Sequence, residues 1–409
     1  MKEKILILLL LTGCTFLYGQ NEEEMTSVVS GTVVDTNGKP LAHVNVIADS
    51  TNIAVVTNDD GFFTLKTPEQ PSFILVSHIG YQSRRIPIIT GKTENLRIRL
   101  HASSVVLKDV VVKSGDPQKI FYDALDKIPD NYPHQADLFR TFYRETVQKR
   151  QRYIYIAEAV ANLYKASYRS TIRADKVAIE KGRRLLSPRQ QDTLGVKIMG
   201  GPTSPIYLDF VKNTDLMLNA EDLSHYEFFM EDPVFIAERP HYVIRLEPRY
   251  LAPYALYYGT FYIDWETLAF TRAELSLDMR DKEKATRYML VSKPAGVRFR
   301  PRELSVLVNF MYDGIYSRIS YVKNVFRFNC DWKKRFFATS FTAVSELVVT
   351  DRKEKNVTAI KGRESFYQKD SFFDKVSFFE DPGFWMDYNI IEPTVSLEDA
   401  ITKLKKKKN

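Results

Sequence analysis

The sequence predicts a mainly β protein: an N-terminal seven-stranded β-sandwich followed by a large curved antiparallel sheet domain with a few helices. Three observations support this class. Short runs of β-branched and aromatic residues alternate with turn residues along most of the chain. Aromatic residues make up 13% of the sequence, with 26 Phe and 23 Tyr, and they favour pleated sheets. The 409 residues exceed one ordinary domain and suffice for two, each with its own core.

The first residues predict an export signal. Two lysines precede an apolar run from Ile5 to Leu17, and a polar acidic segment follows Gly19. The run has about 13 residues, whereas a membrane span needs roughly 20. We therefore expect residues 1–19 to be a signal peptide and residues 20–27 a spacer. The protein is then expected to be exported, to the periplasm or the outer membrane.

Two cysteines limit the redox chemistry. The stretch LTGC, which ends at Cys14, resembles a lipobox, so lipidation of Cys14 is one outcome. Cleavage near Gly19 is the other, because small residues suit that position. Either outcome leaves Cys330 as the single unmodified cysteine, so an intrachain disulfide is excluded. We expect Cys330, in FRFNCDW, to be a small sheet residue rather than a reactive thiol.

The formal net charge of +7 lies mostly at the two ends of the chain. The export signal carries +1 and the five lysines of the final KLKKKKN carry +5, so the body is nearly neutral. This distribution gives no support to a nucleic-acid partner. The lysines belong to a predicted C-terminal helix and tail, residues 396–409. We expect a solvated end there, with an anionic membrane surface as the alternative contact.

Residues 28–113 predict the sandwich. The turn Asn37–Pro40 is expected to close the first hairpin, and Asn58–Gly61 a second one. Asp59 and Asp60 are expected to hydrogen-bond their own backbone, with Gly61 at positive φ, so this acidic pair needs no calcium ion. Seven β runs surround these turns: VVSGTVVD, VNVIA, AVVT, FFTLK, FILVSH, RRIPII and NLRIRL.

The same domain resembles a known family, the carboxypeptidase regulatory-like domain, which is a transthyretin-like seven-stranded sandwich. The residues that carry this resemblance are Gly31, Val33, Asp35, Gly38, Pro40, Leu41, Val44, Val46, Thr57, Asn58, Asp60, Gly61, Phe63, Leu65, Ser77, Gly80 and Tyr81. The resemblance implies an accessory β domain. Such domains are common at the front of exported envelope proteins, including outer-membrane transporters. It does not imply peptidase activity.

Residues 114–395 predict an antiparallel β domain with helical segments. Asp116 and Pro117 are expected to start a helix that ends before Pro129. The run IYLDFVKN is a candidate helix, and Ser396 is the expected cap of the C-terminal helix. Short turns between strands make an antiparallel meander the default. The expected strands are LFRTFYRETVQ, RYIYIAEAVANLYKA, YEFFME, HYVIRLEP, ALYYGTFYID, LAFTRAELSLD, ATRYMLVS, VRFRPRELSVLVNF, YSRISYVKNVFRFN and FATSFTAVSELVVT.

One hairpin in this domain carries a second, looser resemblance. The segment from Tyr258 to Asp278, with Asp264–Thr267 as its turn, is similar to strand pairs in lipoprotein-carrier half-barrels of the gram-negative envelope. In such half-barrels a curved sheet encloses an apolar cavity. The resemblance implies a lipid-like ligand as an alternative to a protein partner.

No catalytic, cofactor or metal site is predicted. The six histidines are scattered, and the pair His225 and Glu227 provides two metal ligands without a third. GGPTSP lacks the lysine and hydroxyl end of a phosphate loop. Glu231-Asp232 and Glu380-Asp381 each precede a proline and are expected at loop entries. A triad of residues far apart in the sequence stays open.

Three arginines form the one candidate binding feature. Arg298, Arg300 and Arg302 alternate with apolar residues, so a strand there presents three guanidinium groups on one face. A solvated sheet face is one interpretation, and an anion-binding stripe for lipid headgroups or acidic glycans is the other.

These observations predict a non-enzymatic cell-envelope protein with a binding or assembly role. An envelope protein partner is the leading expectation, and a lipid-like ligand in a sheet cavity is the alternative. A hydrolase with dispersed active-site residues is the second alternative. No cofactor and no nucleic acid are expected, while peripheral membrane contact is a further candidate.

Overall fold

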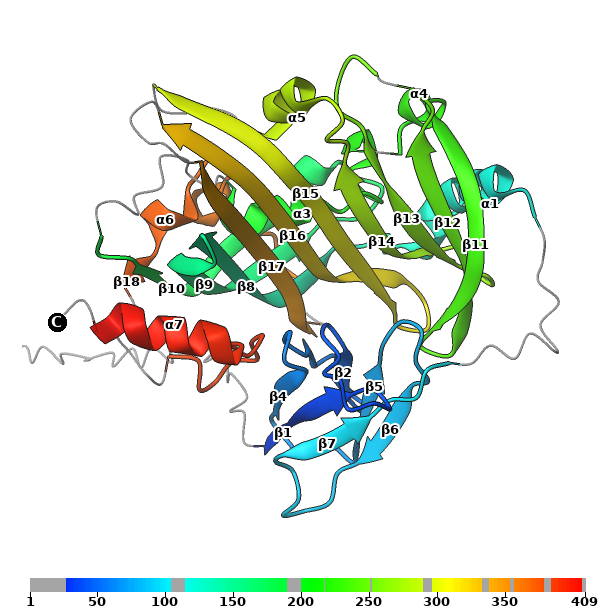
Figure 1. Ribbon diagram of the computed structural model, residues 1–409. Coiled ribbons are helices and arrows are strands. Elements are labelled where there is room, and N and C mark those ends of the chain that lie inside the picture. The colour runs from blue at the N-terminus through cyan, green and yellow to red at the C-terminus, as the bar shows by residue number, and fades with distance from the viewer. Residues whose placement is uncertain are drawn as a thin grey trace, which may run out of the picture.

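The computed structural model describes residues 27–103, 115–189, 200–216, 218–250, 252–289, 296–332, 338–353, 357–378 and 384–406. A small sandwich of N-terminal strands lies against one face of a large sheet built by the rest of the chain (Figure 1). The expected class, a mainly β protein with a sandwich followed by a large antiparallel sheet, is confirmed. The predicted export signal and Cys14 lie outside the described residues.

The sandwich contains the seven predicted strands. Its two sheets have the orders β4-β1-β7 and β3-β2-β5-β6, and β1 and β7 are its one parallel pair among the described strands. Alternating residues such as Val29, Val33, Phe63 and Leu65 point inward and are fully buried. The strands are β1 (Ser27–Val34), β2 (Asn45–Ala48), β3 (Ala54–Val56), β4 (Phe62–Thr67), β5 (Phe73–Ser77), β6 (Arg84–Pro87) and β7 (Leu96–Arg99).

Both predicted turns form, but neither closes a hairpin. β1 pairs with β4 and β7, whereas β2 pairs with β3 and β5. The turn at Asn37–Pro40 therefore leads from one layer to the other, and so does the turn at Asn58–Gly61. Local turn chemistry reverses the chain equally well within a sheet and between two packed sheets, so it does not fix the pairing partner.

The large sheet has the strand order β11-β12-β13-β14-β15-β16-β17-β8-β9-β10-β18. All neighbours are antiparallel except β10 and β18. The predicted meander is present from β11 to β17, and β8 to β10 extend the sheet beyond β17. The strands are β8 (Asp137–Lys149), β9 (Arg152–Lys165), β10 (Lys176–Leu186), β11 (Tyr226–Ile236), β12 (Arg239–Pro248), β13 (Tyr257–Asp264), β14 (Phe270–Leu277), β15 (Val297–Tyr312), β16 (Ser317–Trp332), β17 (Thr339–Lys353) and β18 (Ser377–Phe378).

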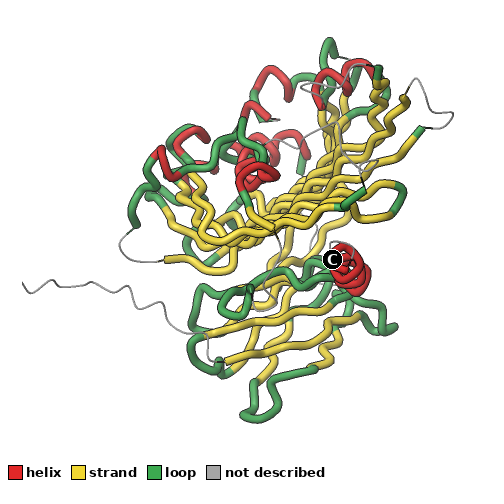
Figure 2. Tube along the Cα trace, turned by 90° about the vertical axis from the view of Figure 1, so that its left-hand side faces the viewer, coloured by secondary structure: helices red, strands yellow, loops and turns green. Residues whose placement is uncertain are grey.

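The two faces of the large sheet are covered differently. Figure 2 shows most helices on one face, called here the helical face, while the sandwich and α7 lie on the other, called the sandwich face. The helices are α1 (Pro117–Asp126), α2 (Ile128–Asn131), α3 (Ser204–Tyr207), α4 (Ala220–Leu223), α5 (Lys282–Met289), α6 (Phe372–Lys375) and α7 (Val395–Lys406). Short 3-10 turns are η1 (Ile172–Ala174), η3 (Gly201–Thr203), η4 (Thr214–Leu216) and η5 (Gly362–Glu364).

Aromatic side chains fill the helical face between α1 and the strands. Phe121 packs edge-on against Phe261 at 5.1 Å and Phe270 at 5.3 Å between ring centroids. Phe210 packs in the same way against Phe261, Phe270 and Phe310. Such edge-to-face pairs add to the free energy gained by burying the rings. This part of the curved sheet is therefore a packed core.

Buried ion pairs hold the connection around α3 to the end of β9. Lys165 Nζ lies 2.8 Å from Asp175 Oδ2 and 2.6 Å from Asp209 Oδ2. Lys212 Nζ lies 2.5 Å from Asp175 Oδ1 and also donates to the backbone oxygen of Ala166. Because each buried charge has a partner, the network fixes this connection without leaving an isolated ion in the interior.

Helix capping confirms one expectation and corrects two. Asp116 caps α1 as predicted, with Oδ1 accepting from Gln118 N at 3.0 Å. Thr394 rather than Ser396 caps α7, because Thr394 Oγ1 accepts from Leu397 N. The run ATRYMLVS, predicted as a strand, lies partly in α5, where Asp281 Oδ1 accepts from two backbone N–H groups of the first turn. That cap satisfies orphan donors and starts a helix in place of the strand.

Two further local predictions are wrong. Of the candidate helix IYLDFVKN, only Ile206 and Tyr207 lie in an α-helix, at the end of α3. Glu231 and Asp232 do not enter a loop but lie within β11, where the register against β12 shifts between Glu231 and Val234. β11 is the edge strand of the sheet, and a bulge with charges and a proline discourages further strand pairing. Glu380-Asp381 lies outside the described residues.

Candidate interaction site at the domain junction

A row of alternating charges crosses the sandwich face of the large sheet. Lys323, Glu346, Arg144, Glu158 and Arg183 stand directly opposite one another on the neighbouring strands β16, β17, β8, β9 and β10. We call these five residues the charge ladder. Lys323 Nζ lies 3.3 Å from Glu346 Oε1, Arg144 Nη2 lies 2.6 Å from Glu158 Oε1, and Arg183 Nε lies 2.9 Å from Glu158 Oε2. Opposite charges at facing positions stabilise the pairing of strands.

The charge ladder is deeply buried at its centre and partly buried at its two ends. The side chains of Arg144 and Glu158 are 4% and 1% exposed. Burial alone raises the pKa of Glu158, but Arg144 and Arg183 outweigh burial and hold it below its ordinary value. Burial likewise opposes the charge of Glu346, but Lys323, the Tyr321 hydroxyl and other neighbouring groups together outweigh it, so the pKa of Glu346 is also lowered. Each buried carboxylate therefore depends on its neighbouring cations.

The sandwich covers the first half of the charge ladder. His43 Nε2 accepts a hydrogen bond from Lys323 Nζ at 3.1 Å, and the His43 ring packs on Tyr321 with 5.2 Å between centroids. Burial and the charge of Lys323 lower the pKa of His43 from 6.5 to about 4. The contact therefore requires a neutral imidazole, because only an unprotonated Nε2 can accept from an ammonium group.

The acidic turn of the sandwich contacts the second domain, contrary to the sequence prediction. Asn58, not the aspartates, bonds the turn's own backbone: its Oδ1 accepts from two N–H groups. Asp59 Oδ1 lies 3.5 Å from Lys323 Nζ, and Asp60 Oδ2 accepts from Val395 N at 2.8 Å. The sequence shows that a turn is present, but it does not show which segment packs on it.

A segment near the end of the chain, residues 384–394, covers the second half of the charge ladder. We call it the C-terminal strap. Trp385 Nε1 donates to Glu158 Oε2 at 3.1 Å, and Arg144 Nη2 donates to the backbone oxygen of Ile391 at 2.7 Å. The Trp385 ring packs edge-on against Phe142 of β8 with 5.6 Å between centroids. The strap thus supplies a polar and an apolar contact to the same two strands.

The strap also holds the sandwich. Lys66 of β4 donates its backbone N–H to Asn389 Oδ1 at 2.8 Å, and its backbone oxygen accepts from Asn389 Nδ2 at 2.9 Å. Lys66 Nζ donates to the backbone oxygens of Trp385 and Tyr388. Val56 of β3 joins buried residues of both the sheet and the strap in one apolar cluster. Sandwich, sheet and strap therefore meet at one shared junction.

The predicted arginine stripe lies on the same strand face as the charge ladder but nearer the start of β15. Arg298, Arg300 and Arg302 are exposed, while the adjacent Val297 and Phe299 are buried in a core on the helical face. Arg300 Nη2 lies 2.5 Å from Asp331 Oδ2 of β16. The expected alternation of sides is thus present, and anion binding by these three residues stays a prediction.

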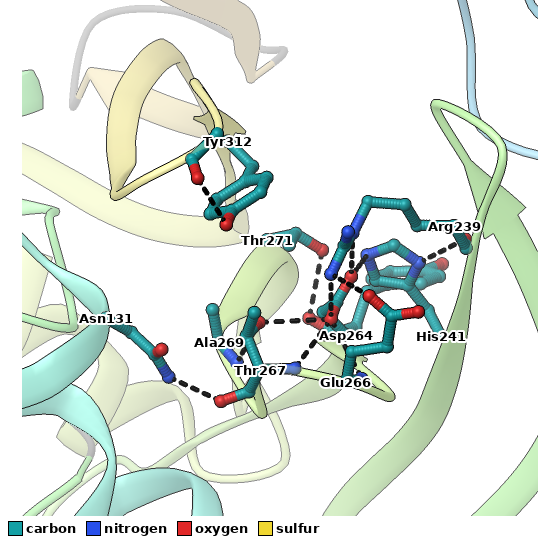
Figure 3. Close-up of polar contacts among 11 residues, drawn as sticks. Asn131, Arg239, His241, Asp264, Glu266, Thr267, Ala269, Thr271 and Tyr312 are labelled. Atoms are coloured by element: carbon teal, nitrogen blue, oxygen red, sulfur yellow. Dashed lines mark hydrogen bonds and ion pairs between the residues drawn. The ribbon is translucent and has the colours of Figure 1, made fainter.

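Figure 3 shows a second buried polar cluster, at the predicted turn between β13 and β14. Arg239 donates from Nε and Nη2 to the two oxygens of Asp264, at 2.6 and 2.8 Å. Asp264 Oδ1 also accepts from two backbone N–H groups of the turn. His241 lies beside it, with Nε2 3.9 Å from Asp264 Oδ2. Burial opposes the charge of Asp264, but these hydrogen bonds lower its pKa, whereas burial lowers the pKa of His241.

This cluster does not have the geometry of a hydrolytic triad. In a triad the imidazole stands between a hydroxyl and a carboxylate. Here the Thr267 hydroxyl donates directly to Asp264, and the Thr271 hydroxyl donates to the backbone oxygen of Tyr262. His241 Nδ1 lies 2.8 Å from the backbone oxygen of Arg239 and so donates to it. These bonds fasten the turn, and Asn131 ties it to α2 through the Thr267 oxygen.

One buried acid was not predicted from the sequence. Glu145 of β8 points to the helical face and accepts hydrogen bonds from the hydroxyl groups of Tyr143, at 2.6 Å, and Tyr155. Burial raises the pKa of Glu145 to about 7. The sequence signal for this buried acid was its place in the alternation. Tyr143 and Val147, on the same strand face as Glu145, are aromatic and apolar. Two members of the charge ladder had a similar signal, because Glu158 and Glu346 are each the one acid inside an apolar run.

The remaining sequence candidates show no ligand geometry. No group of three or more potential metal-binding side chains occurs in the part of the chain that the structure describes. His225 packs against the ring of Tyr250 at 4.9 Å between centroids. Cys330 is buried, and burial raises the pKa of its thiol to about 11. Among the described helices, none is long and apolar enough to cross a bilayer.

Comparison with known proteins identifies the sandwich. Residues 29–112 match the family model of the CarboxypepD_reg-like domain. The sandwich belongs to that domain family. Over 106 residues the chain is 31% identical to the TonB-dependent receptor SusC of Bacteroides thetaiotaomicron, which covers 26% of this chain and 10% of the receptor. Over 99 residues it is 31% identical to the TonB-dependent receptor P39 of Formosa agariphila, covering 24% and 9%.

The chain thus spans about a tenth of the length of these relatives, and the similarity is of the size of the CarboxypepD_reg-like domain. Among solved structures, a LolA superfamily protein, NE2245 from Nitrosomonas europaea, aligns with 60% of this chain and 98% of its own at 12% identity and a TM-score of 0.18. A putative outer membrane lipoprotein-sorting protein domain from Vibrio parahaemolyticus aligns with 61% and 97% at 10% identity and a TM-score of 0.26. TM-scores this low support no argument about function.

Proposed function

We propose that this protein is a non-enzymatic component of the cell envelope that acts by binding a protein partner. The observation that carries the proposal is the junction itself, where the CarboxypepD_reg-like domain is held on the large sheet by the charge ladder and the strap. A domain fixed on one side through hydrogen bonds and apolar packing presents its other surfaces in a constant orientation. The relatives that share this domain are named TonB-dependent receptors, which supports an envelope location.

The packing of the helical face favours a partner over an internal ligand. A lipid-like ligand carried by the curved sheet needs an apolar cavity on its inner side. Between α1 and strands β13 to β15, the rings of Phe121 and Phe210 already occupy that space. A carrier function would therefore require these rings to move, at the cost of their buried contacts.

The polar clusters favour binding over catalysis. His241, Asp264 and Thr267 are engaged with the turn between β13 and β14. Glu145 is enclosed by two tyrosines. None of these arrangements joins a nucleophile to a base, which is the geometry that covalent catalysis requires.

Site-directed photocrosslinking in the native envelope tests the proposal. A photoreactive amino acid replaces Ile89 of the sandwich, Ile315 of the β15–β16 turn or Met386 of the strap, which are exposed apolar residues on three different segments. At one of these positions we expect a single crosslinked product of higher mass. Repeated experiments should identify the same partner protein in it. Glu303, a partly exposed residue of β15 paired with Arg327, is the polar position for comparison.

Three results would count against the proposal. Monomer alone at every position would contradict partner binding. A lipid that co-purifies with the protein in stoichiometric amount, detected by native mass spectrometry, would favour the carrier alternative. Turnover of a peptidase, esterase or glycosidase substrate, abolished by one point mutation, would establish the hydrolase alternative instead.

A further inference from the structure

Basic side chains gather at one end of the large sheet. The exposed Arg298, Arg300 and Arg302 lie at the start of β15. Arg300 faces Asn329 of β16, which in turn faces Ser340 of β17. Neighbouring strands are about 4.8 Å apart, so these three positions span only about 10 Å.

The turn between β8 and β9 belongs to the same end. The backbone N–H of Arg150 donates to the oxygen of Ser340 at 3.1 Å, which places this turn beside the start of β17. The turn continues into Arg152, whose side chain is exposed. The cationic surface of β15 therefore extends across β16 and β17 toward β9.

Helix α7 prolongs this surface. A shallow crevice between α7 and the β8–β9 turn is lined by Arg152, Arg189 and Lys403, among others. Figure 1 shows the C-terminal end of α7 on the same side of the molecule as the start of β15. We call Arg152, Arg189, Arg298, Arg300, Arg302 and Lys403 the basic belt; all six residues are exposed.

The basic belt differs from the charge ladder in its exposure to solvent. In the ladder each cation faces a carboxylate, and the whole row is covered by the sandwich and the strap. In the belt, Arg300 pairs with Asp331, and all six basic residues are exposed to solvent. Of the large apolar residues exposed in the described part of the chain, none lies in β15 or among the residues that line the crevice. The surface therefore suits electrostatic contact rather than insertion of apolar side chains.

We propose that the basic belt docks the protein on the anionic lipid headgroups of a membrane surface. The inference rests on the proposed envelope location. The belt is spread over β15, the β8–β9 turn and α7 rather than gathered round a pocket, so it matches a broad anionic plane better than a single small anion. Each basic residue held near such a surface strengthens binding by up to about fivefold, and the attraction is screened by salt.

Vesicle co-sedimentation of the full chain tests this docking. The probes are vesicles of phosphatidylcholine alone and of phosphatidylcholine with phosphatidylglycerol, each at about 0.1 M and about 0.5 M salt. The belt variant is R298Q/R300Q/R302Q. The matched control K92Q/R97Q/R99Q removes the same charge from exposed residues of the sandwich.

We expect wild type and control to bind the anionic vesicles at low salt and to dissociate at high salt. The belt variant is expected to bind roughly 100-fold more weakly, because three cations are lost. The variant R298K/R300K/R302K retains the charges and should retain binding. If the triple glutamine variant does not fold, R298Q and R302Q alone should each weaken binding by up to about fivefold.

Equal binding to both vesicle types, or an equal loss in the control variant, would overturn the proposal. The proposal would also be overturned if the wild type did not bind vesicles but bound polyglutamate through the belt, because that result would assign the belt to an acidic protein partner. The crosslinks expected in the native envelope do not depend on these arginines. Failure of the belt and failure of partner binding are therefore distinguishable.

Discussion

The side-chain amide of Asn389 hydrogen-bonds both the backbone N–H and the backbone C=O of Lys66. At this residue of β4 it takes the place of a neighbouring strand. β4 is the outer strand of its three-stranded sheet, and an outer strand leaves N–H and C=O groups unpaired. An amide side chain offers N–H donors and a carbonyl acceptor in one plane, so it can pair with a backbone N–H and C=O at the same time. Through this residue the strap closes a sheet edge and adds to the contacts that join the two domains.

Replacing this amide should destabilise the protein. In Asn389→Ala, two partly buried backbone groups of Lys66 lose their partners, and we expect the free energy of unfolding to fall by about 2 kcal/mol. Urea unfolding followed by circular dichroism measures the change. Asn37→Ala, at an exposed turn position, is the control and should stay within about 0.5 kcal/mol of the wild type. Equal effects of the two substitutions would show that the edge contact contributes nothing.

The charge ladder should depend on its central acid. Glu158→Gln keeps the shape of the side chain but leaves Arg144 and Arg183 buried without their anion. We expect a loss of about 3 kcal/mol or more in the free energy of unfolding. Glu303→Gln, in an exposed pair with Arg327, should cost less than about 1 kcal/mol. The order of these two losses, measured by urea unfolding, checks the burial of the ladder.

The neutral His43 should make stability sensitive to acid. Its pKa is about 4 in the folded protein and 6.5 as an unperturbed group. Between these values the unfolded chain binds a proton that the folded chain excludes, so the free energy of unfolding falls as pH falls from 6.5 to 4. Asn at position 43 tolerates the positive φ of 57° found there. Relative to wild type, His43→Asn should therefore gain stability steadily as pH falls through this window; parallel curves would contradict the burial of His43 as a neutral imidazole.

Glu145 should produce the opposite dependence. Burial raises its pKa from 4.5 to about 7, so the folded chain holds a proton that the unfolded chain releases in this range. The free energy of unfolding contributed by this group therefore falls as pH rises from 4.5 to 7. Glu145→Gln removes the titration, so its stability relative to wild type should rise with pH across the same window. Urea unfolding at a series of pH values measures both this slope and that of His43→Asn, and their opposite signs serve as mutual controls.

Local patterns were sufficient for most strands and for the ends of several elements. Asp116 and Pro117 predict the start of α1 correctly. The side-chain acceptor of Asp116 and the fixed φ of Pro117 both act within one helical turn. Alternation of sides in Arg298, Arg300 and Arg302 follows from the pleat of a single strand. The same reasoning failed at ATRYMLVS, where Asp281 supplies a helix cap just before the run.

By itself the sequence determined a β protein of two parts, the seven strands of the sandwich and the positions of its turns, because φ/ψ preference and side-chain alternation act over a few residues. Only the tertiary structure decided that Asp59 faces Lys323, that Asn389 pairs with Lys66, and that five single charges on five strands form one row. The reason is that these contacts join segments tens to hundreds of residues apart. Their partners are set by strand register and by the packing of layers, which no short stretch of sequence encodes.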